Sequence, residues 1–334
     1  MSEIVVSVVM SVYKEPTEWL RQSIDSILNQ TFRDFEFIII CDNPLYTEGI
    51  ELLKQYADCD KRIVLIFNDK NFGLTKSLNK GISLSRGRYI ARMDADDVSL
   101  LTRLEKQVYF MEAHPEKDLC HTNYAYIDEL SIIKCERVSN PDLSTQDFLF
   151  WHNVIAHPTV IFRNKLLTLR TPLYNEEIKI GQDYELWAIL TLANAEVGFL
   201  DEVLLNYRKS QNQISSQKLE EQHNNTLKIR KKLILSYLKR RGIVQEVERQ
   251  DIKKIFNNLK LYLESNKANN ENEIRNLQRI QYILYYTLAC NDSKYVAKFL
   301  LDRNMRQMSA NYKDIARVAI APILGWKYRT MKFE

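Results

Sequence analysis

The sequence lacks the signals of disulfide-bonded, zinc-binding and membrane-spanning proteins. Its five cysteines are odd in number, and none has the Cys-x-x-Cys or Cys/His spacing of a metal site. This usage predicts buried free thiols in a reducing compartment. The chain does not open on a basic segment followed by an apolar run, so we expect no signal peptide. No stretch approaches the ~20 apolar residues of a membrane span, which predicts a cytoplasmic protein that is soluble or peripheral.

Charge is unevenly distributed over the 334 residues. Residues 1–215 carry a net charge of −8 and residues 216–334 a net charge of +12, which together give the overall +4. The length allows one large domain, or one domain with an appendage. An acidic front and a basic rear indicate two functions, and a basic rear can face anionic lipid or nucleic acid.

Apolar runs alternate with amphipathic segments from the start of the chain to about residue 112. This alternation predicts an α/β fold with a doubly wound, mostly parallel sheet. The expected strands are residues 4–10, 35–40, 63–67 and 89–93, and the expected helices are residues 17–29, 48–56, 74–83 and 103–112.

The pattern changes twice after that. From residue 119 to about residue 206 it is mixed, with strands expected at 159–162 and 196–200 and a helix at 184–193. A polar stretch at 216–226 predicts a linker or an exposed helix start, and only helical periodicity follows, with Gly242 as a break. We therefore expect one domain of residues 1–215 and a basic helical region of residues 216–334.

Three carboxylates in four positions, Asp94, Asp96 and Asp97, follow the expected strand at residues 89–93. A strand that ends in acids places them at the carboxyl edge of the sheet, where open α/β folds bind ligands. Carboxylates this close repel one another unless a cation lies among them, and the Asp-x-Asp spacing suits Mg²⁺ or Mn²⁺ holding a diphosphate. The alternative is a solvated acidic turn, which the preceding strand disfavours.

Further motifs occur in a fixed order along the front of the chain. They are the strand at residues 6–13, Gln30-Thr31-Phe32 before the strand at 35–40, Asn71-x-Gly73-Leu74, Asn79-x-Gly81-Ile82, Gly87-x-Tyr89-Ile90 and Asp183-Tyr184-x-Leu186-Trp187. With the acids they resemble the family 2 glycosyltransferases of the GT-A fold, over about residues 4–215. The resemblance implies a Rossmann-like, mostly parallel sheet flanked by helices, with the basic helical region as an extension. It also implies metal-dependent, inverting transfer from a nucleotide sugar, with UDP as the expected nucleotide.

The resemblance places the nucleotide sugar at the ends of the expected strands. Tyr13 and Glu15 follow the first strand, where an aromatic ring suits stacking on a base. Their alternative roles are packing at the sheet edge for Tyr13 and solvation for Glu15. Asp42 follows the second strand, where a family carboxylate accepts a hydrogen bond from the base. The chain has Cys41-Asp42-Asn43-Pro44 where relatives have two acids, and an Asx turn before Pro44 explains Asp42 as well.

Side chains that can donate hydrogen bonds to the nucleotide sugar are expected at the same edge. Asn71 and Lys76 lie at a loop-to-helix junction that suits phosphate or ribose oxygens, and the alternative is a capped helix with one exposed lysine. Arg92 precedes the acids and can pair with Asp94 or with the diphosphate, pairing with the acid being the more frequent outcome.

The resemblance also assigns roles to the acids. Asp96 is the expected chief ligand of Mn²⁺ or Mg²⁺, and Asp94 holds the ribose or shares the metal. Asp97 is expected to cap the following helix. Asp183, which follows Gln182 where relatives have a glutamate, is the expected catalytic base that takes the proton of the acceptor hydroxyl. An N-cap of the helix that follows also explains Asp183.

Other residues are expected around the acceptor. His157 orients the acceptor or the base, or is a structural histidine, and Gln182 and Trp187 shape the cleft. Arg208 contacts phosphate or pairs with a surface acid. Ser210 stands where many relatives place a histidine that completes the metal shell, so water or Asn212 would substitute for it.

The rear of the chain carries two basic, amphipathic stretches, residues 228–241 and 316–333. Aromatic and basic residues together suit a membrane interface, and the alternative is the solvated face of a helical bundle. We expect peripheral binding to the inner face of the cytoplasmic membrane. The expected acceptor is a saccharide linked to polyprenyl (undecaprenyl) diphosphate in surface-polysaccharide synthesis, such as O-antigen or capsule.

Two other functions were weighed against this one. A nucleotidyltransferase is expected to have a glycine-rich, basic loop after the first strand, and residues 12–15 contain no glycine. A non-catalytic protein that binds membrane or nucleic acid needs neither Asp96 nor Asp183. Because residues 216–334 offer no aromatic stacking platform on a sheet, we expect no nucleic-acid partner.

Overall fold

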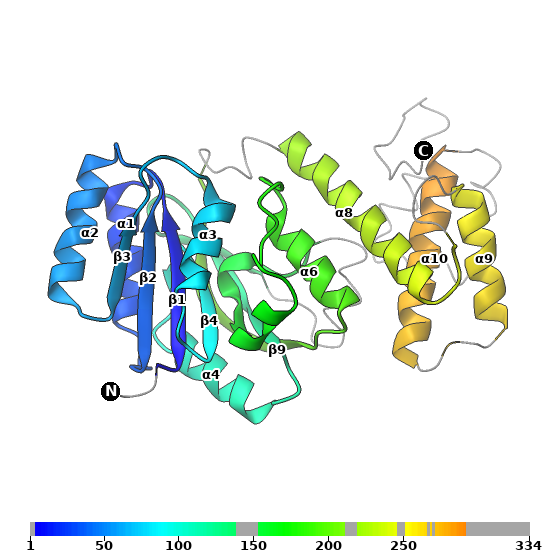
Figure 1. Ribbon diagram of the computed structural model, residues 1–334, viewed down its shortest axis with the longest axis horizontal. Helices are drawn as coiled ribbons and strands as arrows, with labels where there is room; N and C mark the ends of the chain where they lie inside the picture. The colour runs from blue at the N-terminus through cyan, green and yellow to red at the C-terminus, as the bar shows by residue number, and fades with distance from the viewer. Residues whose placement is uncertain are drawn as a thin grey trace. The chain divides into compact units, whose positions relative to one another are not determined.

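The structure is a computed structural model that describes residues 4–137, 153–210, 219–245, 251–265, 268 and 271–291. The chain divides into two compact units (Figure 1). The first contains residues 1–145 and 154–222, and the second contains residues 146–153 and 223–334. The division falls a few residues after residue 215, where the sequence pattern changes.

Parallel strands form the front half of the sheet of the first unit, in the order β3-β2-β1-β4 (Figure 1). Ser11 of β1 lies opposite Asp94 of β4, and Val12 lies opposite Cys41 of β2, so the strands end at a common carboxyl edge. The strand order reverses between β1 and β4, which makes their shared end the topological switch point where such sheets bind ligands. The bounds are β1 Val6–Val12, β2 Phe35–Cys41, β3 Ile63–Phe67 and β4 Tyr89–Asp94.

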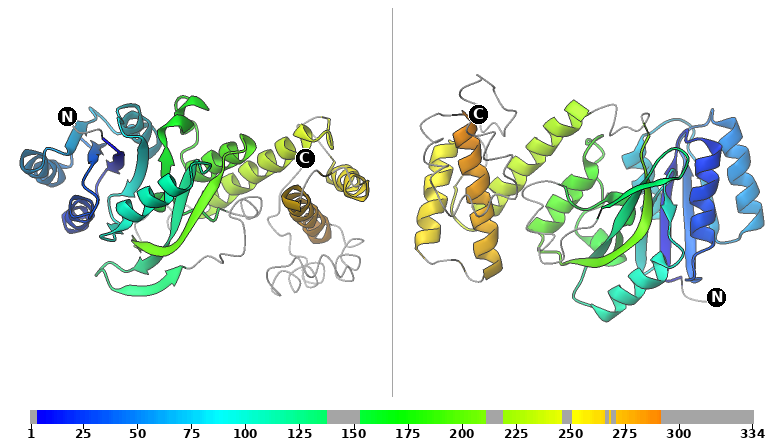
Figure 2. Two further views of the ribbon diagram at one scale, coloured as in Figure 1. Left: turned by 90° about the horizontal axis from the view of Figure 1, so that it is seen from below. Right: turned by 180° about the vertical axis from the view of Figure 1, so that it is seen from behind.

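Helices cover both faces of these strands, as right-handed crossovers require. On one face, Met10 and Phe37 share a buried core with Leu20 of α1 and Leu104 of α4. On the other face α3 approaches closely, since a Cβ added at Gly81 would lie 2.6 Å from Ile40 Cδ1. The helices on the first face are α1 (Thr17–Leu28), α2 (Thr47–Cys59) and α4 (Arg103–Ala113), and α3 (Leu74–Ser83) is on the second (Figures 1 and 2).

The rear half of the sheet is mixed and continues from β4 in the order β8-β6-β9-β5, with β7 paired to β6. The pairing of β5 with β9 returns the segment just after the acids to the end of β9, where Val98 lies opposite Asn206. The bounds are β5 Val98–Ser99, β6 Leu119–Ile127, β7 Ile133–Arg137, β8 Ile161–Arg163 and β9 Val197–Arg208, with the 3₁₀ helices η1 His157–Thr159 and η2 Asn164–Thr168 and the helix α6 Gln182–Leu192.

The expected α/β fold with a mostly parallel front sheet is confirmed. Differences appear in the rear half. The strand expected at 159–162 begins as the 3₁₀ turn η1, because Pro158 has no backbone N–H for a strand ladder. The strand expected at 196–200 continues to Arg208 as β9, since its carboxyl half pairs with β6 and β5, contacts that no local pattern reveals.

The second unit is helical in its described residues, and α9 and α10 lie side by side (Figures 1 and 2). Phe256 and Tyr285 place their ring centroids 4.9 Å apart between them, and Arg241 pairs with Glu273 at 2.7 Å. The break expected at Gly242 is confirmed. No helix in the described part of the chain is both long and apolar enough to span a membrane. The helices are α8 (Leu219–Arg240), α9 (Ile252–Glu264) and α10 (Glu271–Asn291).

The thiols of Cys41, Cys59, Cys120 and Cys135 are free, as expected. Cys41 and Cys120 are buried in the sheet, which confirms the prediction of buried thiols for these two. Cys59 and Cys135 are exposed, because one ends helix α2 and the other lies on the edge strand β7.

Candidate active site

Glu15 lies just beyond β1 and is held by two contacts. The backbone N–H of Tyr13 donates to its Oε2 at 2.8 Å, and the Tyr46 hydroxyl donates to its carbonyl oxygen. Burial raises the pKa of Glu15 to about 7, and the nearby Asp96 and Asp94 add to the rise. The structure therefore brings Glu15 close to the acids after β4, instead of leaving it solvated. The Tyr13 side chain is 39% exposed, which leaves area for stacking.

The three acids after β4 occupy three different environments. Asp94 is paired with the buried guanidinium of Arg92, as expected. Asp96 is half-buried, and its carbonyl accepts from Arg208 Nε at 2.7 Å. Asp97 is fully buried, and its Oδ1 accepts from the Arg208 backbone N–H at 2.8 Å. Burial, with the charges of Asp96 and Asp94, holds the pKa of Asp97 well above its usual range.

The prediction that Asp97 caps the next helix is wrong. Helix α4 begins at Arg103, and its N-cap residue is Thr102. The short strand β5 intervenes, and its pairing with β9 turns the Asp97 carboxylate toward the Arg208 backbone.

Asp42 organises the loop between β3 and α3. Its carboxylate is 2% exposed and accepts hydrogen bonds from Asn68 Nδ2, from Phe72 N and from Gly73 N, at 2.7, 2.9 and 2.8 Å. The Asx turn before Pro44 is formed instead by Asn43, whose Oδ1 accepts from Leu45 N at 3.0 Å.

This loop carries Asn71 and Lys76, the two residues expected to bind phosphate or ribose oxygens of the nucleotide sugar. Asn71 and Lys76 are both exposed, and the N-cap residue of α3 is Gly73, with no side-chain cap. Neither residue is consumed by helix capping. The Asp42 carboxylate thus fixes the loop on which both of them stand.

Asp183 is the second residue of α6, not its N-cap. Gly181 is the N-cap residue, with φ of 82°, a left-handed conformation that favours glycine. Asp183 is half-buried in the first turn, where the helix macrodipole stabilises a carboxylate. The capping alternative for Asp183 is therefore wrong, and Gln182, which precedes it, is 8% exposed.

His157, Tyr174 and Trp187 form a buried aromatic cluster. His157 Nε2 and the Tyr174 hydroxyl are 2.6 Å apart. Burial raises the pKa of Tyr174, and the charges of Asp183 and Asp94 raise it further, while Arg92 lowers it. Asp183 and Asp94 therefore both influence the Tyr174 hydroxyl electrostatically. No sequence motif marks Tyr174, which was therefore not among the expected site residues.

His157 and Trp187 are interior residues. Burial and the charge of Arg92 hold the pKa of His157 well below its usual range, so the ring is neutral. The Trp187 ring centroid lies 6.2 Å from that of His157, and Trp187 is only 1% exposed. Trp187 thus supports the site from the core and does not line an open cleft.

Arg208 connects several segments around the acids. It is fully buried, and its guanidinium donates to the carbonyl oxygens of Asp96 and Asp128, to Ser131 Oγ and to Gln22 Oε1, at 2.7 to 3.0 Å. It also lies 4.9 Å from the centroid of the Trp19 ring. Arg208 therefore joins residues 94–97, which we call the acid loop, to α1 and to the turn between β6 and β7. We call this set of contacts the Arg208 clamp.

Few of the described side chains are placed to coordinate a metal ion. In the described part of the chain, no group of three or more His, Cys, Asp and Glu side chains is gathered closely enough to hold an ion. Ser210 is 9% exposed, and Asn212 lies outside the described residues. Two carboxylates, Asp94 and Asp96, fit Mg²⁺ or Mn²⁺ of the kind that substrate phosphates and water also coordinate.

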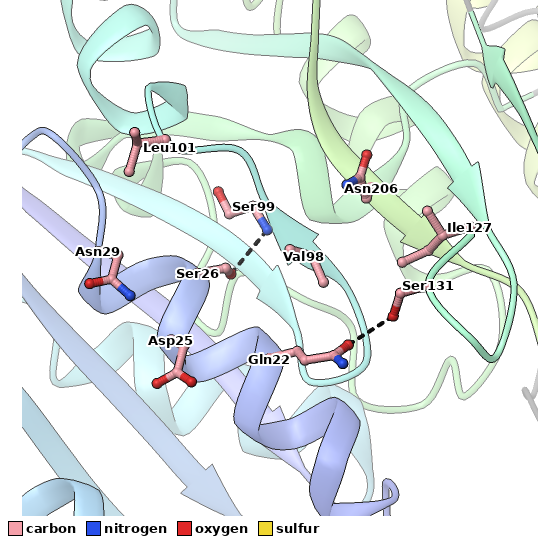
Figure 3. Close-up of a pocket in the computed structure, with 10 residues that line it drawn as sticks. All are labelled: Gln22, Asp25, Ser26, Asn29, Val98, Ser99, Leu101, Ile127, Ser131 and Asn206. Carbon is pink, nitrogen blue, oxygen red and sulfur yellow. Dashed lines mark hydrogen bonds between the residues drawn. The ribbon is translucent and has the colours of Figure 1, made fainter. Parts of the chain in front are cut away.

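A pocket of about 410 Å³ lies on the other side of the acid loop, between α1, β5 and β9 (Figure 3). Its described lining includes none of the residues expected to bind donor, metal or acceptor. Arg208 separates it from Asp96, because Gln22 of the lining accepts from Arg208 Nη2. The candidate active site is the strand edge and not this pocket. The lining residues are Gln22, Asp25, Ser26, Asn29, Val98, Ser99, Leu101, Ile127, Ser131 and Asn206.

Solved structures similar to this chain share its fold. The S. aureus TarS fragment 1–349, solved in complex with UDP and with UDP-GlcNAc, superposes with TM-scores of 0.59 at 15% and 14% sequence identity. In each case the match covers 99% of this chain and 97% of the other. The GT-A fold is thereby confirmed, including helices at the carboxyl end.

Sequence relatives and a family model agree with the fold. An uncharacterized glycosyltransferase of Methanocaldococcus jannaschii is 38% identical, over 62% of this chain and 72% of its own length. The O-antigen biosynthesis glycosyltransferase WbnJ of Escherichia coli is 34% identical, over 61% of this chain and 79% of its own length. The model of Glycosyl transferase family 2 matches residues 7–167, which include the strand edge and its acids. The chain therefore belongs to the family 2 glycosyltransferases.

Proposed function

We propose that this chain moves a sugar from a UDP-linked donor to a hydroxyl group of a saccharide, with inversion at the anomeric carbon. The observation that carries the proposal is the meeting of two acidic elements. The carboxylates of Asp94, at the end of β4, and of Asp183, on α6, both raise the pKa of the buried Tyr174, which indicates that they share one neighbourhood. A metal-type acid pair and a lone carboxylate in one neighbourhood are the two parts that a single displacement requires.

The donor would lie across the ends of β1, β2 and β4. Tyr13 offers an exposed ring for the base, and Asn71 and Lys76 stand on the loop that Asp42 fixes. The similar TarS fragment has been solved with UDP and with UDP-GlcNAc, which supports a uridine donor for this fold. The Asp42 carboxylate is engaged in hydrogen bonds to the loop. We therefore assign it the role of organising the donor site, not of binding the base directly.

Mn²⁺ or Mg²⁺ would be held by Asp94 and Asp96. Burial is the main cause of the raised pKa values of Glu15 and Asp97, and the charges of Asp94 and Asp96 add to the rise. A bound cation would offset the charge that grows on the diphosphate leaving group. Arg92, paired with Asp94, keeps that carboxylate oriented.

Asp183 is the proposed base. The macrodipole of α6 favours its ionised form, and an ionised carboxylate can take the proton of an acceptor hydroxyl as that oxygen attacks the anomeric carbon. The buried Tyr174, whose hydroxyl lies 2.6 Å from Nε2 of the neutral His157, feels the charge of Asp183. Inversion follows because one carboxylate serves one displacement.

The acceptor class rests on the relatives. WbnJ of Escherichia coli is named for O-antigen biosynthesis, and AmsE of Erwinia amylovora, 29% identical over 79% of its length, for amylovoran biosynthesis. A saccharide carried on undecaprenyl diphosphate at the inner membrane surface agrees with the basic rear of the chain. The stretch at 228–241 is mostly helical in α8, whereas the stretch at 316–333 lies outside the described residues.

The test is release of nucleoside diphosphate from a panel of nucleotide sugars with Mn²⁺. Wild type is compared with Asp183→Asn and with the exposed control Asp58→Asn of α2. Turnover of one donor should fall about 10²- to 10⁴-fold in Asp183→Asn and stay within twofold in Asp58→Asn, as for loss of a general base. Equal turnover in wild type and Asp183→Asn would remove Asp183 from the mechanism. Absence of donor binding and turnover across the panel would refute the proposed function.

A further inference from the structure

Three tyrosines gather where β6 and β9 run side by side. Tyr126 lies directly opposite Tyr207 in the strand pairing, and Tyr124 precedes Tyr126 on the same side of β6. Their ring centroids are 5.2 to 5.8 Å apart, and two of the three ring pairs meet edge to face. The hydroxyls of Tyr124 and Tyr126 are 3.2 Å apart. We call these three residues the tyrosine cluster.

The tyrosine cluster is rigid but not buried. Tyr124 and Tyr207 pack against the hydrophobic core, and Lys209 Nζ lies 3.6 Å from the centroid of the Tyr126 ring. All three tyrosines nevertheless keep part of their surface exposed. Ordered aromatic rings with open area lose little conformational entropy when they bind a ligand.

The residues of the tyrosine cluster are not part of the pocket beside α1. Ile127 of β6 and Asn206 of β9 both line that pocket (Figure 3). Their neighbours Tyr126 and Tyr207 are not among the residues that line it.

The cluster is continuous with the candidate active site. The backbone N–H of Arg208, the residue after Tyr207, donates to Asp97 Oδ1 at 2.8 Å. Burial raises the pKa of Tyr207, and the charges of Asp97, Asp94 and Asp96 raise it further, which reflects their closeness. A ligand on the tyrosine cluster would thus lie next to the acids that hold the donor diphosphate in the proposed function.

We propose that the tyrosine cluster is a binding platform for a pyranose ring of the acceptor saccharide. The proposal rests on the proposed function for the identity of its ligand. One face of a pyranose ring carries C–H groups, which pack on aromatic rings, and its edge carries hydroxyls, which the phenol groups of Tyr124 and Tyr126 can hydrogen-bond. The platform would fix the acceptor beside the donor. It would not use Tyr13, the aromatic side chain proposed to stack on the donor base.

The platform is tested with the full chain and with methyl glycosides of glucose, galactose, N-acetylglucosamine and N-acetylgalactosamine as probes. Saturation-transfer NMR, in the presence of UDP and Mg²⁺, reports which sugar protons contact the protein. The variants are Tyr126→Ala, Tyr126→Phe and Tyr126→Leu, and the control is Tyr109→Ala, because Tyr109 of α4 is 77% exposed and lies outside the cluster. Tyr126→Leu keeps most of the volume should the alanine variant fail to fold.

At least one glycoside should bind wild type, Tyr109→Ala and Tyr126→Phe, and its ring-proton signals should weaken tenfold or more in Tyr126→Ala and Tyr126→Leu. The dissociation constant of UDP should change less than twofold in every variant. Unchanged glycoside signals in Tyr126→Ala, or no glycoside bound by wild type, would overturn the platform. Loss of UDP affinity in parallel with the glycoside would assign the rings to the nucleotide and also overturn it.

The outcome is independent of the nucleotide-sugar assay. Glycoside binding that depends on Tyr126 supports the platform even where no donor is turned over. Glycoside binding that ignores Tyr126 overturns the platform even where turnover by Asp183 is established.

Discussion

Replacing Glu15 by glutamine should make the protein less sensitive to alkaline pH. The pKa of this carboxyl is 4.5 in an unperturbed chain and about 7 in the folded protein, chiefly through burial. The folded state therefore holds the proton more tightly than the unfolded state. The contribution of Glu15 to stability is fully present below pH 4.5 and is lost as the pH rises through 7.

The size of the effect follows from the shift. Each pKa unit corresponds to about 1.4 kcal/mol, so the shift sets an upper limit of about 3 kcal/mol for the loss between pH 4.5 and pH 8. Because the side chain is only partly buried, solvent screening should reduce this to roughly 1–2 kcal/mol. Glutamine keeps an oxygen that accepts from the Tyr13 N–H but carries no charge beside Asp94 and Asp96.

The assay is thermal unfolding of wild type, Glu15→Gln and the control Glu51→Gln, an exposed residue of α2, at pH 5 and pH 8 without divalent cations. Between these pH values the midpoint of Glu15→Gln should rise by about 3–6 °C relative to wild type, as 1–2 kcal/mol implies for a unit of this size. Added Mn²⁺ at pH 8 should shrink the difference, since a cation offsets the charge on Glu15. Parallel pH responses of all three proteins would refute the assignment of a raised pKa to Glu15.

Two further variants test how the loops of the active site are held. Arg208→Lys removes the planar guanidinium group that joins Asp96, Asp128 and Gln22. It should lower the unfolding midpoint by several degrees and weaken Mg²⁺ binding about tenfold. Unchanged Mg²⁺ affinity in a calorimetric titration would show that Arg208 has no role in positioning Asp96. Asp42→Asn replaces one accepting oxygen with an N–H group that faces a loop N–H. It should therefore lower the free energy of unfolding, measured with urea, by about 1–3 kcal/mol. A loss no larger than that in Asp58→Asn would contradict the role of Asp42 as loop organiser.

The front half of the fold could be predicted from sequence because its signals are local. Buried parallel strands appear as continuous apolar runs, and amphipathic helices carry a 3.6-residue apolar stripe between them. The site at the end of β4 followed from the same rule, since acids after a buried strand lie at the sheet edge. The rear half could not be predicted in this way, because β5 and β9 pair across more than a hundred residues and neither has a distinctive pattern.

The same long-range pairing decides what each acid does. In sequence, Asp94, Asp96 and Asp97 are three equivalent carboxylates, and a helix N-cap is the simplest role for the last of them. In the structure, β9 delivers the Arg208 backbone to Asp97 and the Arg208 side chain to the Asp96 carbonyl, while Arg92 of β4 takes Asp94.

The consequence is a division of labour that only the tertiary fold creates. Asp97 is withdrawn into the core as a structural acceptor, which leaves the half-buried carboxylates of Asp94 and Asp96 as the pair suited to a divalent cation. Because Arg208 sets the position of Asp96 from the strand that also carries Tyr207, a cation site and the tyrosine cluster share one support. A change on β9 should therefore affect metal binding and glycoside binding together, whereas a change in the loop held by Asp42 should affect neither of them directly.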